Sequence, residues 1–287
     1  MAAPDLSQQP YARLEQLEPG VARLLAPNPS AFTYTGTQSY LVGDSEVVVI
    51  DPGPALSDHI EALLAAIAGR PVVAIACTHT HRDHSPAATA LKAATGAAIV
   101  GCAALAIDTV GPRADASFDF DYAPDRVLAD GEAIMVDGRS LTAVATPGHT
   151  SNHLCYEFGD ALFTGDHVMG WSTTVVVPPD GDMAAYMASL DKLRHRKDRL
   201  FYPAHGPAVT RPQQIVRGML GHRMQREKQI LRLVGEGRDT IPAIVARAYP
   251  GLDPRLVPAA GGSVLAHLVD LERRGVVSLD GETWTAA

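Results

Sequence analysis

Three histidines and an aspartate stand within six consecutive positions of this 287-residue chain, in the stretch THTHRDHS at 78–85. Neutral imidazole nitrogens and a carboxylate are the ligands that Zn²⁺ and similar divalent ions prefer. A single histidine is more often an ordinary core or surface residue, but the chain has only 11 histidines and places three of them here. The cluster therefore predicts a metal site, and its members are His79, His81, Asp83 and His84.

Three other segments supply matching side chains at the ends of predicted strands. His149 lies in VATPGHT, Asp166 in LFTGDHV and His205 in LFYPAHG. Each follows an apolar run at a Gly or Pro residue, where the backbone turns tightly. We therefore expect four loops to converge on one site. Two divalent ions about 3.5–4 Å apart in such a site share a hydroxide, which attacks a carbonyl or phosphoryl group polarised by the same ions.

The elements that must position these residues follow from the hydrophobic pattern. SYLVG and EVVVIDPG predict two strands, and Leu and Ile at helical spacing predict an amphipathic helix at 55–68. VVAIAC is a predicted buried strand, and PAATALKAATG a helix with Pro near its start and Gly at its end. Further short strands and a helix at about 182–195 follow. This alternation predicts a layered α/β core.

The pattern changes near residue 213. A long basic helix is predicted at about 213–234, followed by a helix, a loop, a second helix and two short strands around the turn LDGE. Two helices and a hairpin in this order suggest a winged helix. We therefore predict a catalytic domain at 1–212 and a C-terminal domain, the basic helix included, at 213–287.

Four motifs together resemble a known family. HTHRDH at 79–84, TPGHT at 146–150, TGD at 164–166 and PAHG at 203–206 are similar to the ordered motifs of the metallo-β-lactamase superfamily of hydrolases. The resemblance implies an αββα sandwich of two β-sheets flanked by helices, with the site at one edge. It also implies two zinc ions, the first held by His79, His81 and His149, the second by Asp83, His84 and His205, with Asp166 bridging both.

The residues around these ligands have expected roles of their own. Asp83 is the candidate catalytic residue, since it is placed both to hold a metal and to orient the hydroxide or accept its proton. Asp51 in IDPG is expected to orient a ligand, and His153 to do the same or to contact the substrate. Four residues after the bridging acid either line the pocket or pack locally, namely His167, Trp171, Thr173 and Thr174.

A closer resemblance extends over nearly the full chain. The segments NPSAFTYTGTQSYLVG at 28–43, TTVVVPPDGDMAAYMASLDKL at 173–193 and YPAHGP at 202–207, with the winged-helix tail, are similar to the lactamase-beta-2-like subgroup. Its members include a single-strand-specific endoribonuclease of mitochondria, while most bacterial members are known only as hydrolases. True zinc β-lactamases generally have Cys or Ser at the second metal site, so Asp166 implies at most a weak or promiscuous β-lactamase activity.

The charge distribution leaves the substrate open. The net charge is −8, yet residues 192–232 hold 11 of the 24 Lys and Arg against two acidic residues. This segment indicates an anionic partner, with Arg223 and Arg226 as candidate anion contacts. Single-stranded RNA and a small anionic ester, thioester or lactone both fit, although overall acidity and 6% aromatic residues argue against tight RNA binding. A non-catalytic nucleic-acid-binding regulator is a further alternative, which the complete ligand set disfavours.

Composition also bears on compartment and assembly. The three cysteines are widely spaced without a CxxC motif, which is typical of buried thiols in a reducing compartment. No stretch of 18 uncharged apolar residues predicts a membrane span, and residues 1–20 have no apolar segment of a secretory signal. We therefore expect a cytoplasmic enzyme. A homodimer that packs through the C-terminal domain is left open.

Overall fold

Two facing β-sheets form the core of the chain, in a computed structural model that describes residues 5–106 and 118–287. The first sheet has seven strands in chain order, antiparallel from β1 to β4 and parallel from β4 to β7. Its strands are β1 (Glu15–Glu18), β2 (Val21–Leu25), β3 (Gln38–Val42), β4 (Val47–Ile50), β5 (Val72–Cys77), β6 (Ala98–Gly101) and β7 (Arg126–Val127). Every residue of β3 and β4 is buried, which agrees with the wholly apolar sequence of β4, whereas β3 begins with the buried polar residues Gln38 and Ser39.

The second sheet has five strands in the order β12-β11-β10-β9-β8, with β11 and β12 parallel and the other pairs antiparallel. Its strands are β8 (Ala133–Val136), β9 (Arg139–Ala145), β10 (Leu154–Phe158), β11 (Ala161–Gly165) and β12 (Leu200–Pro203). Because β9, β11 and β12 run in the same direction, their carboxyl ends meet at one edge of the sheet. The loops that carry His149, Asp166 and His205 begin at this edge.

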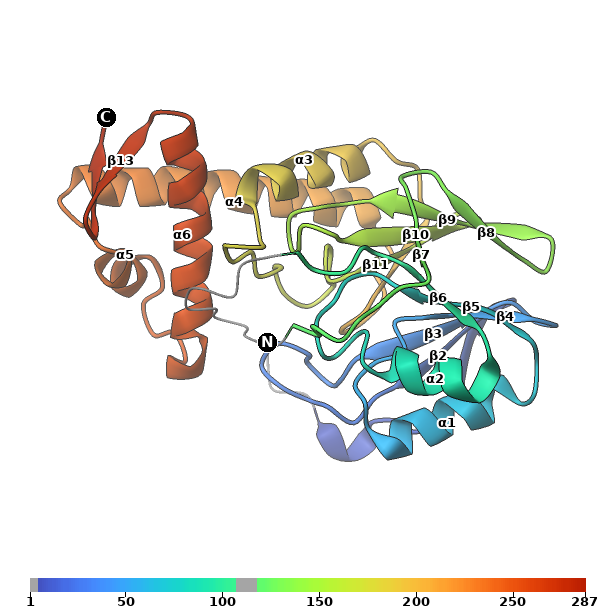
Figure 1. Cartoon of the computed structure of the whole chain (residues 1–287). Coiled ribbons are helices and arrows are strands. Elements are labelled where there is room, and N and C mark those ends of the chain that lie inside the picture. The colour runs from blue at the N-terminus through green and yellow to red at the C-terminus, as the bar shows by residue number, and fades with distance from the viewer. Residues whose placement is uncertain (1–4, 107–117) are drawn as a thin grey trace.

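Helices cover the outer face of each sheet, so the layers are helix, sheet, sheet and helix (Figure 1). The predicted αββα sandwich is confirmed. The first sheet carries α1 (Ser57–Ile67) and α2 (Ala87–Thr95), and the second carries α3 (Met183–Arg194) and the first half of α4 (Pro212–Gly235). A 3₁₀ turn (Leu6–Gln8) precedes β1. Among the helices in residues 5–106 and 118–287, none combines the length and the apolar character that a bilayer crossing requires.

Hydrogen bonds join the two sheets close to the edge that carries the loops. The Tyr156 hydroxyl on β10 donates a hydrogen bond to the carbonyl of Cys77, the last residue of β5, at 2.8 Å. The Tyr40 hydroxyl on β3 donates to the carbonyl of Pro203, the last residue of β12, at 2.7 Å. Each bond ties the end of one loop-bearing strand to the opposite sheet, so the loops that follow start from fixed positions.

The C-terminal residues form two helices and a hairpin, as predicted. These are α5 (Ile241–Ala248), a 3₁₀ turn (Pro254–Leu256), α6 (Val257–Arg273), β13 (Val277–Asp280) and β14 (Thr283–Ala286). They enclose a hydrophobic core of their own, which includes Val264, Leu268 and Trp284. This is the arrangement of a winged helix, with the hairpin as the wing.

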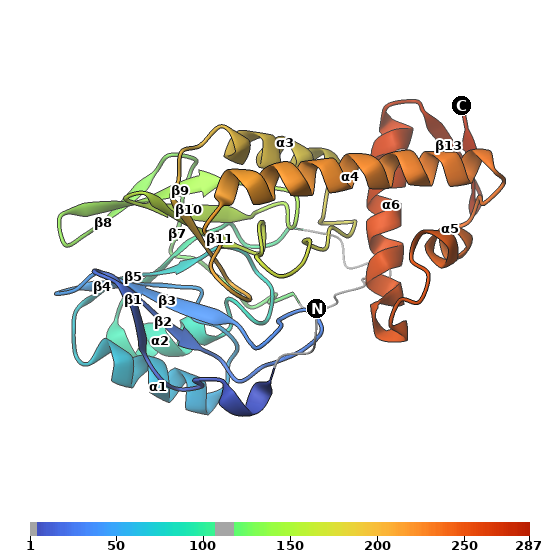
Figure 2. The same cartoon turned by 180° about the vertical axis from the view of Figure 1, so that it is seen from behind.

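The long helix α4 belongs to both parts of the molecule, as its course along the top of Figure 2 shows. Val216 and Met219 in its first half pack into the core between α3 and the second sheet. Ile230, Leu233 and Val234 in its second half pack into the core of the winged helix. The helix therefore joins the two cores, and the division at 212/213 stays a prediction.

Candidate metal centre

All seven candidate ligands come together at the edge where the loops meet. His79, His81, His149 and Asp166 form one group, and Asp83, His84 and His205 form a second. Within each group the potential ligand atoms lie within 4.8 Å of one another. Six of the seven side chains are buried and Asp83 is half-buried. Two adjacent clusters of nitrogen and oxygen ligands are the arrangement expected for two metal ions.

In the first cluster, three imidazole nitrogens converge on one point. The Nδ1 atom of His81 lies 2.9 Å from Nε2 of His79 and 3.1 Å from Nε2 of His149. On its other side, the His149 ring directs Nδ1 at the carbonyl oxygen of Val175, 2.7 Å away. A carbonyl can only accept, so Nδ1 of His149 carries the proton and Nε2 presents its lone pair to the cluster.

The second cluster is built in the same way. Nδ1 of His205 donates to the carbonyl of Gly36 at 3.2 Å, and its Nε2 faces Oδ2 of Asp83 at 3.1 Å. Nδ1 of His84 lies 2.9 Å from Oδ2 of Asp51, and its Nε2 faces Oδ2 of Asp83 at 3.3 Å. Both histidines are therefore oriented by an acceptor behind them and present Nε2 to the cluster.

Asp166 faces both clusters with different oxygens. Its Oδ2 lies 3.6 Å from Nε2 of His149 in the first cluster. Its Oδ1 lies 3.2 Å from Nε2 of His205 and 3.6 Å from Nε2 of His84 in the second. A carboxylate with one oxygen toward each group of ligands is placed to bridge two cations.

The donor set fits metal ions. Among the described residues, Oδ1 of Asp166 and Nε2 of His84 are buried without a hydrogen-bond partner. Buried polar atoms without partners are costly, and lone pairs that face one another across about 3 Å repel. A divalent cation between these atoms removes both costs. The nitrogen and carboxylate ligands, without a thiolate, suit Zn²⁺ and other borderline divalent ions.

Electrostatics keep the two carboxylates ionised. Burial alone raises the pKa of Asp83 and of Asp166, but the neighbouring His84 and His205 outweigh it and hold both pKa values well below the ordinary range. Burial lowers the pKa of His205, yet Asp166 and Asp83 raise it to about 10. Burial and the facing histidines lower the pKa of His79. The two carboxylates are therefore ionised beside His84 and His205, and the imidazole of His79 is neutral.

Asp51 lies behind the two clusters of candidate ligands and contacts His84. Its Oδ1 accepts the backbone N–H of Thr78 at 2.7 Å, and its Oδ2 accepts the Thr78 hydroxyl at 2.7 Å in addition to His84. Thr78 in turn contacts Nδ1 of His79 at 2.9 Å. A single buried carboxylate therefore supports one histidine of each cluster.

His153 and His167 lie behind Asp166. His153 accepts the backbone N–H of Asp166 on Nε2 at 3.3 Å and contacts the Thr146 hydroxyl through Nδ1 at 2.9 Å. The His167 ring packs on Tyr186 with centroids 4.8 Å apart, and burial lowers its pKa to about 3. Both rings are fully enclosed, so neither lines an open pocket. His153 supports the backbone of Asp166, whereas His167 packs on Tyr186.

The residues after Asp166 mostly pack against the protein. Trp171 stacks on Tyr34 with ring centroids 4.9 Å apart. The Thr174 hydroxyl is buried and donates to the carbonyl of Asp166 at 2.7 Å. Thr173 is exposed. Of these candidates for the pocket, Thr173 alone is exposed, whereas Thr174 supports the backbone of Asp166.

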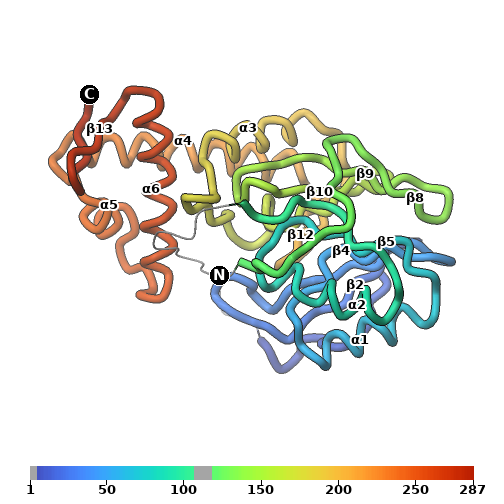
Figure 3. Tube along the Cα trace, viewed as in Figure 1, coloured from blue at the N-terminus to red at the C-terminus, as the bar shows by residue number. Residues whose placement is uncertain are grey.

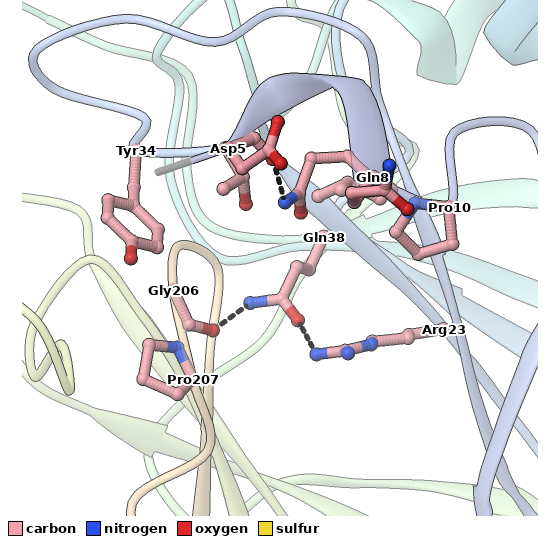
Figure 4. Close-up of a pocket in the computed structure, with 11 residues that line it drawn as sticks. Asp5, Gln8, Pro10, Arg23, Tyr34, Gln38, Gly206 and Pro207 are labelled. Carbon is pink, nitrogen blue, oxygen red and sulfur yellow. Dashed lines mark hydrogen bonds between the residues drawn. The ribbon is translucent and has the colours of Figure 1, made fainter. Parts of the chain in front are cut away.

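Two residues near the site were not singled out from the sequence. The Thr37 hydroxyl donates to Oδ2 of Asp83 at 3.2 Å. Gln38 donates from Nε2 to the carbonyl of Pro203 at 3.1 Å. It also donates to the carbonyl of Gly206 at 2.6 Å and accepts from Arg23, as Figure 4 shows. These bonds cross the back of a crevice of about 350 Å³ and tie the turn that carries His205 to β3. Their sequence signal is the polar run Thr37-Gln38-Ser39 where β3 begins.

Arg223 and Arg226 direct their guanidinium groups to acceptors within the chain. Arg223 is only 3% exposed and donates to the carbonyl of Thr174. Arg226 is half-buried, donates to the carbonyl of Ala248 at 2.8 Å and lies 3.9 Å over the Tyr249 ring. This differs from the expected anion contacts, because both guanidinium groups serve as donors to carbonyl oxygens where α4 packs against its neighbours.

Other basic residues of the segment 192–232 also have partners. Four of them form ion pairs with carboxylates, namely Lys192 with Asp130, Arg194 with Asp191, Arg196 with Asp198 and Arg199 with Asp160. Most of the basic side chains in this segment therefore bind groups within the chain. Arg217 and Lys228 lie on α4 at positions that reach solvent.

Two families match this chain. The metallo-beta-lactamase superfamily matches residues 33–205, and the beta-lactamase-associated winged helix domain matches residues 240–284. Together they span the sandwich that carries the metal cluster and the C-terminal helices and hairpin.

Curated relatives match over most of the chain. It is 32% identical to the beta-lactamase-like protein 2 homolog of Caenorhabditis elegans, over 92% of this chain and 88% of that protein. It is 33% identical to an atrochrysone carboxyl ACP thioesterase of Aspergillus chevalieri, over 80% of this chain and 70% of that protein. The thioesterase dmxR1 of Cryptosporiopsis sp. is 30% identical over 78% of this chain, and the match spans only 65% of that relative.

Solved structures share the fold over nearly the whole chain. A metallo-beta-lactamase family protein from Thermus thermophilus aligns with a TM-score of 0.78 at 22% identity, covering 95% of this chain and 100% of that one. A beta-lactamase domain protein from Burkholderia ambifaria aligns with a TM-score of 0.79 at 20% identity, covering 96% and 94%. At these identities the likeness shows that sandwich and winged helix occur together elsewhere in one architecture.

Proposed function

Because the chain belongs to the metallo-β-lactamase superfamily of metallo-hydrolases, we propose that it is a dinuclear zinc enzyme that hydrolyses a thioester. The observation that carries this proposal is the position of Asp166, with one carboxylate oxygen toward each of two clusters of ligands. We assign His79, His81 and His149 to one ion, Asp83, His84 and His205 to the other, and Asp166 to both.

The chain's own residues supply the remaining parts of a hydrolytic site. When bound, two divalent ions supply Lewis acidity and lower the pKa of a bound water toward neutrality. Asp83 has a side chain that is 23% exposed, against 12% for Asp166, so it is the more accessible of the two carboxylates. Its low pKa keeps it ionised at neutral pH. An ionised, accessible Asp83 is therefore placed to orient the attacking water by accepting a hydrogen bond from it.

A thioester substrate is supported by the relatives' names. Several curated relatives at 30–33% identity are called thioesterases of an acyl carrier protein. A thioester carbonyl needs activation of water and a place for the developing oxyanion, and a two-metal site supplies both. No nucleophilic Ser or Cys is required, which agrees with the burial of all three cysteines. These reduced, buried thiols also support the cytoplasm as the predicted compartment.

Endoribonuclease activity is the second candidate. It is favoured by the match to the beta-lactamase-like protein 2 homolog over 92% of the chain, in line with the subgroup resemblance. The phosphate backbone dominates RNA affinity, which demands many free cations. Most basic side chains of residues 192–232 bind carboxylates or carbonyls within the chain, so few cations are left for RNA. The thioester is therefore the better supported substrate.

A regulator that only binds nucleic acid fits less well. In winged helices that read DNA, one helix enters the major groove. Here α6 is buried along much of its length, and Arg273 at its end pairs with Asp182 of the catalytic part. Its surface is therefore largely engaged within the chain.

A side-by-side assay tests the proposal. The zinc-loaded protein is given an acyl thioester, a lactone, bis(p-nitrophenyl) phosphate, nitrocefin and single-stranded RNA at equal enzyme concentration. We expect the thioester to be hydrolysed with the highest kcat/KM. Preferred cleavage of RNA, weakened by the charge reversals Arg217→Glu and Lys228→Glu on α4, would establish the nuclease instead.

Metal identity is tested separately. Purified protein loaded with Zn²⁺ and freed of excess is expected to hold about two ions per chain. Loading with Mn²⁺ or Fe²⁺ in parallel, followed by the thioester assay, identifies the ion that supports turnover. A metal content near zero after loading contradicts the site assignment itself.

A further inference from the structure

The segment 174–177 lies between the metal cluster and the C-terminal helices. Its first residue supports the bridging acid, because the Thr174 hydroxyl donates to the carbonyls of Asp166 and His167 at 2.7 and 3.0 Å. Its second residue supports a histidine, because the Val175 carbonyl accepts Nδ1 of His149 at 2.7 Å. Two adjacent residues thus position a candidate ligand each, and any shift of this segment displaces both.

Arg223 of α4 fixes this segment from the other side. Its Nη2 donates to the carbonyl of Thr174, and its guanidinium lies 5.3 Å from the centre of the Tyr186 ring. The Tyr186 hydroxyl in turn donates to the carbonyl of His167 at 3.1 Å. Arg223 therefore holds the carbonyl of the same residue whose hydroxyl holds Asp166.

The burial of Arg223 is energetically demanding. It is 3% exposed, and within the described ranges no carboxylate forms an ion pair with it. A buried charge without a counter-charge must gain its stability from dipoles such as carbonyl oxygens and aromatic faces. Displacement of the Thr174 carbonyl would remove the acceptor of Nη2 and leave the guanidinium only its contact with Tyr186. The bond between them is thus strongly favoured and makes the position of Thr174 well defined.

The helix α6 confines the far end of the segment. A Cβ atom placed on Gly262 would lie 2.7 Å from both γ-carbons of Val177, so only glycine allows this approach. Figure 3 shows the loop between β11 and α3 running beside α6. The segment is therefore held between α4 at Thr174 and α6 at Val177, and both helices contribute to the winged-helix core.

We propose that Arg223 is a positioning residue for the metal centre, and that α4 and α6 use it and Gly262 to hold segment 174–177 in the conformation that presents Asp166 and His149 to the metals. The proposal rests on the metal centre assigned above. In this protein the winged helix thereby acts as a support for the catalytic site.

The test compares metal affinity in matched variants. Metal-free wild type, Arg223→Met, Arg223→Lys and Thr174→Val are titrated with Co²⁺, followed by visible absorption, and with Zn²⁺ in competition with a chelator. We expect Arg223→Met and Thr174→Val each to weaken metal binding about tenfold. This is the lower end of the range of about 10–100-fold for residues that orient a metal ligand without binding the metal. Arg223→Lys keeps a donor for the carbonyl and is expected to recover part of the loss, with a Co²⁺ spectrum closer to wild type.

A neighbouring arginine supplies the control. Arg226, one turn along α4, contacts Ala248 and Tyr249 of the C-terminal domain instead of segment 174–177. Arg226→Met is therefore expected to lower the unfolding temperature but to leave Co²⁺ affinity within about twofold of wild type, since it touches no residue that supports a ligand. Equal weakening by Arg226→Met would overturn the proposal in favour of a general effect of the C-terminal domain.

A double variant shows whether Arg223 and Thr174 act on the metal ligands through the same segment. In the double variant Arg223→Met with Thr174→Val, we expect a loss of affinity close to that of either single variant, because both act through one segment. Fully additive losses contradict a shared path. If Arg223→Met does not fold, Arg223→Lys and Thr174→Val complete the comparison. Absence of metal binding in the wild type would instead refute the metal centre, a result that the same titration distinguishes.

Discussion

Nδ1 of His84 lies 2.9 Å from Oδ2 of Asp51, and both side chains are almost fully buried. Asp51 also accepts two hydrogen bonds from Thr78, the residue directly before the cluster of histidines. The carboxylate therefore fixes the tautomer and ring orientation of His84 while it holds the start of the loop. Such an outer partner raises the basicity of a ligating histidine.

Asp51→Asn tests this arrangement. The amide removes the negative charge behind His84 and cannot accept all three bonds in the same way, so we expect Zn²⁺ affinity to fall by about 10–100-fold. The measurement is competition with a chelator. Asp58→Asn, a change of the same kind on the exposed start of α1, serves as the control. Unchanged affinity in Asp51→Asn would remove this residue from the support of the site.

Asp166→Asn tests the bridging assignment. The amide offers one oxygen and no charge, so it serves at most one of the two clusters. We expect metal content after zinc loading to fall from about two ions to about one, and thioester turnover to fall by more than about 100-fold, beyond the loss of an outer partner. Near-ultraviolet circular dichroism checks that the fold is kept. Wild-type turnover with two bound ions would contradict the role given to Asp166.

Much of the site could be predicted because its chemistry lies in side chains at the ends of strands. The apolar runs that end at Cys77, Ala145, Gly165 and Pro203 are strands, and the candidate ligands follow each of them as expected. A buried strand has a clear sequence pattern, and histidines and aspartates beside Gly or Pro identify where a loop begins.

The supports of the site could not be predicted in the same way. Val175 and Gly36 act through their backbone carbonyls, which every residue has, so no pattern identifies them. The sequence predicts Arg223 as an anion contact because it lies in the basic segment 192–232. Its burial follows from a second packing partner, the loop after Asp166, whose position depends on contacts between residues far apart in the chain.

Gly148→Ala tests how closely the loop of His149 packs on α3. Gly148 has φ +138°, and a Cβ there would lie 2.3 Å from Cα of Tyr186. Backbone strain and overpacking together are expected to lower the free energy of unfolding by at least about 2 kcal/mol and to weaken zinc binding through His149. Gly69→Ala has φ +75° and no atom within 4 Å, so it measures the smaller strain of the left-handed helical region without any contact. Equal effects of the two substitutions on unfolding and on zinc affinity would show that the contact with Tyr186 is unimportant.

The stability of the C-terminal domain is expected to depend on pH through His267. The ring is 1% exposed on α6, and burial, with the nearby Arg223 and Arg226, lowers its pKa to about 3. The unfolded chain takes up a proton on this histidine near pH 6.5, whereas the folded chain does so only near pH 3. The contribution of the neutral ring to the free energy of unfolding is therefore fully present above pH 6.5 and is lost as the pH falls toward 3. Urea unfolding of the metal-free protein should therefore show wild type losing about 1.4 kcal/mol more than His267→Leu between about pH 7.5 and 5.5. A constant difference between the two proteins over this interval would contradict a neutral, buried His267.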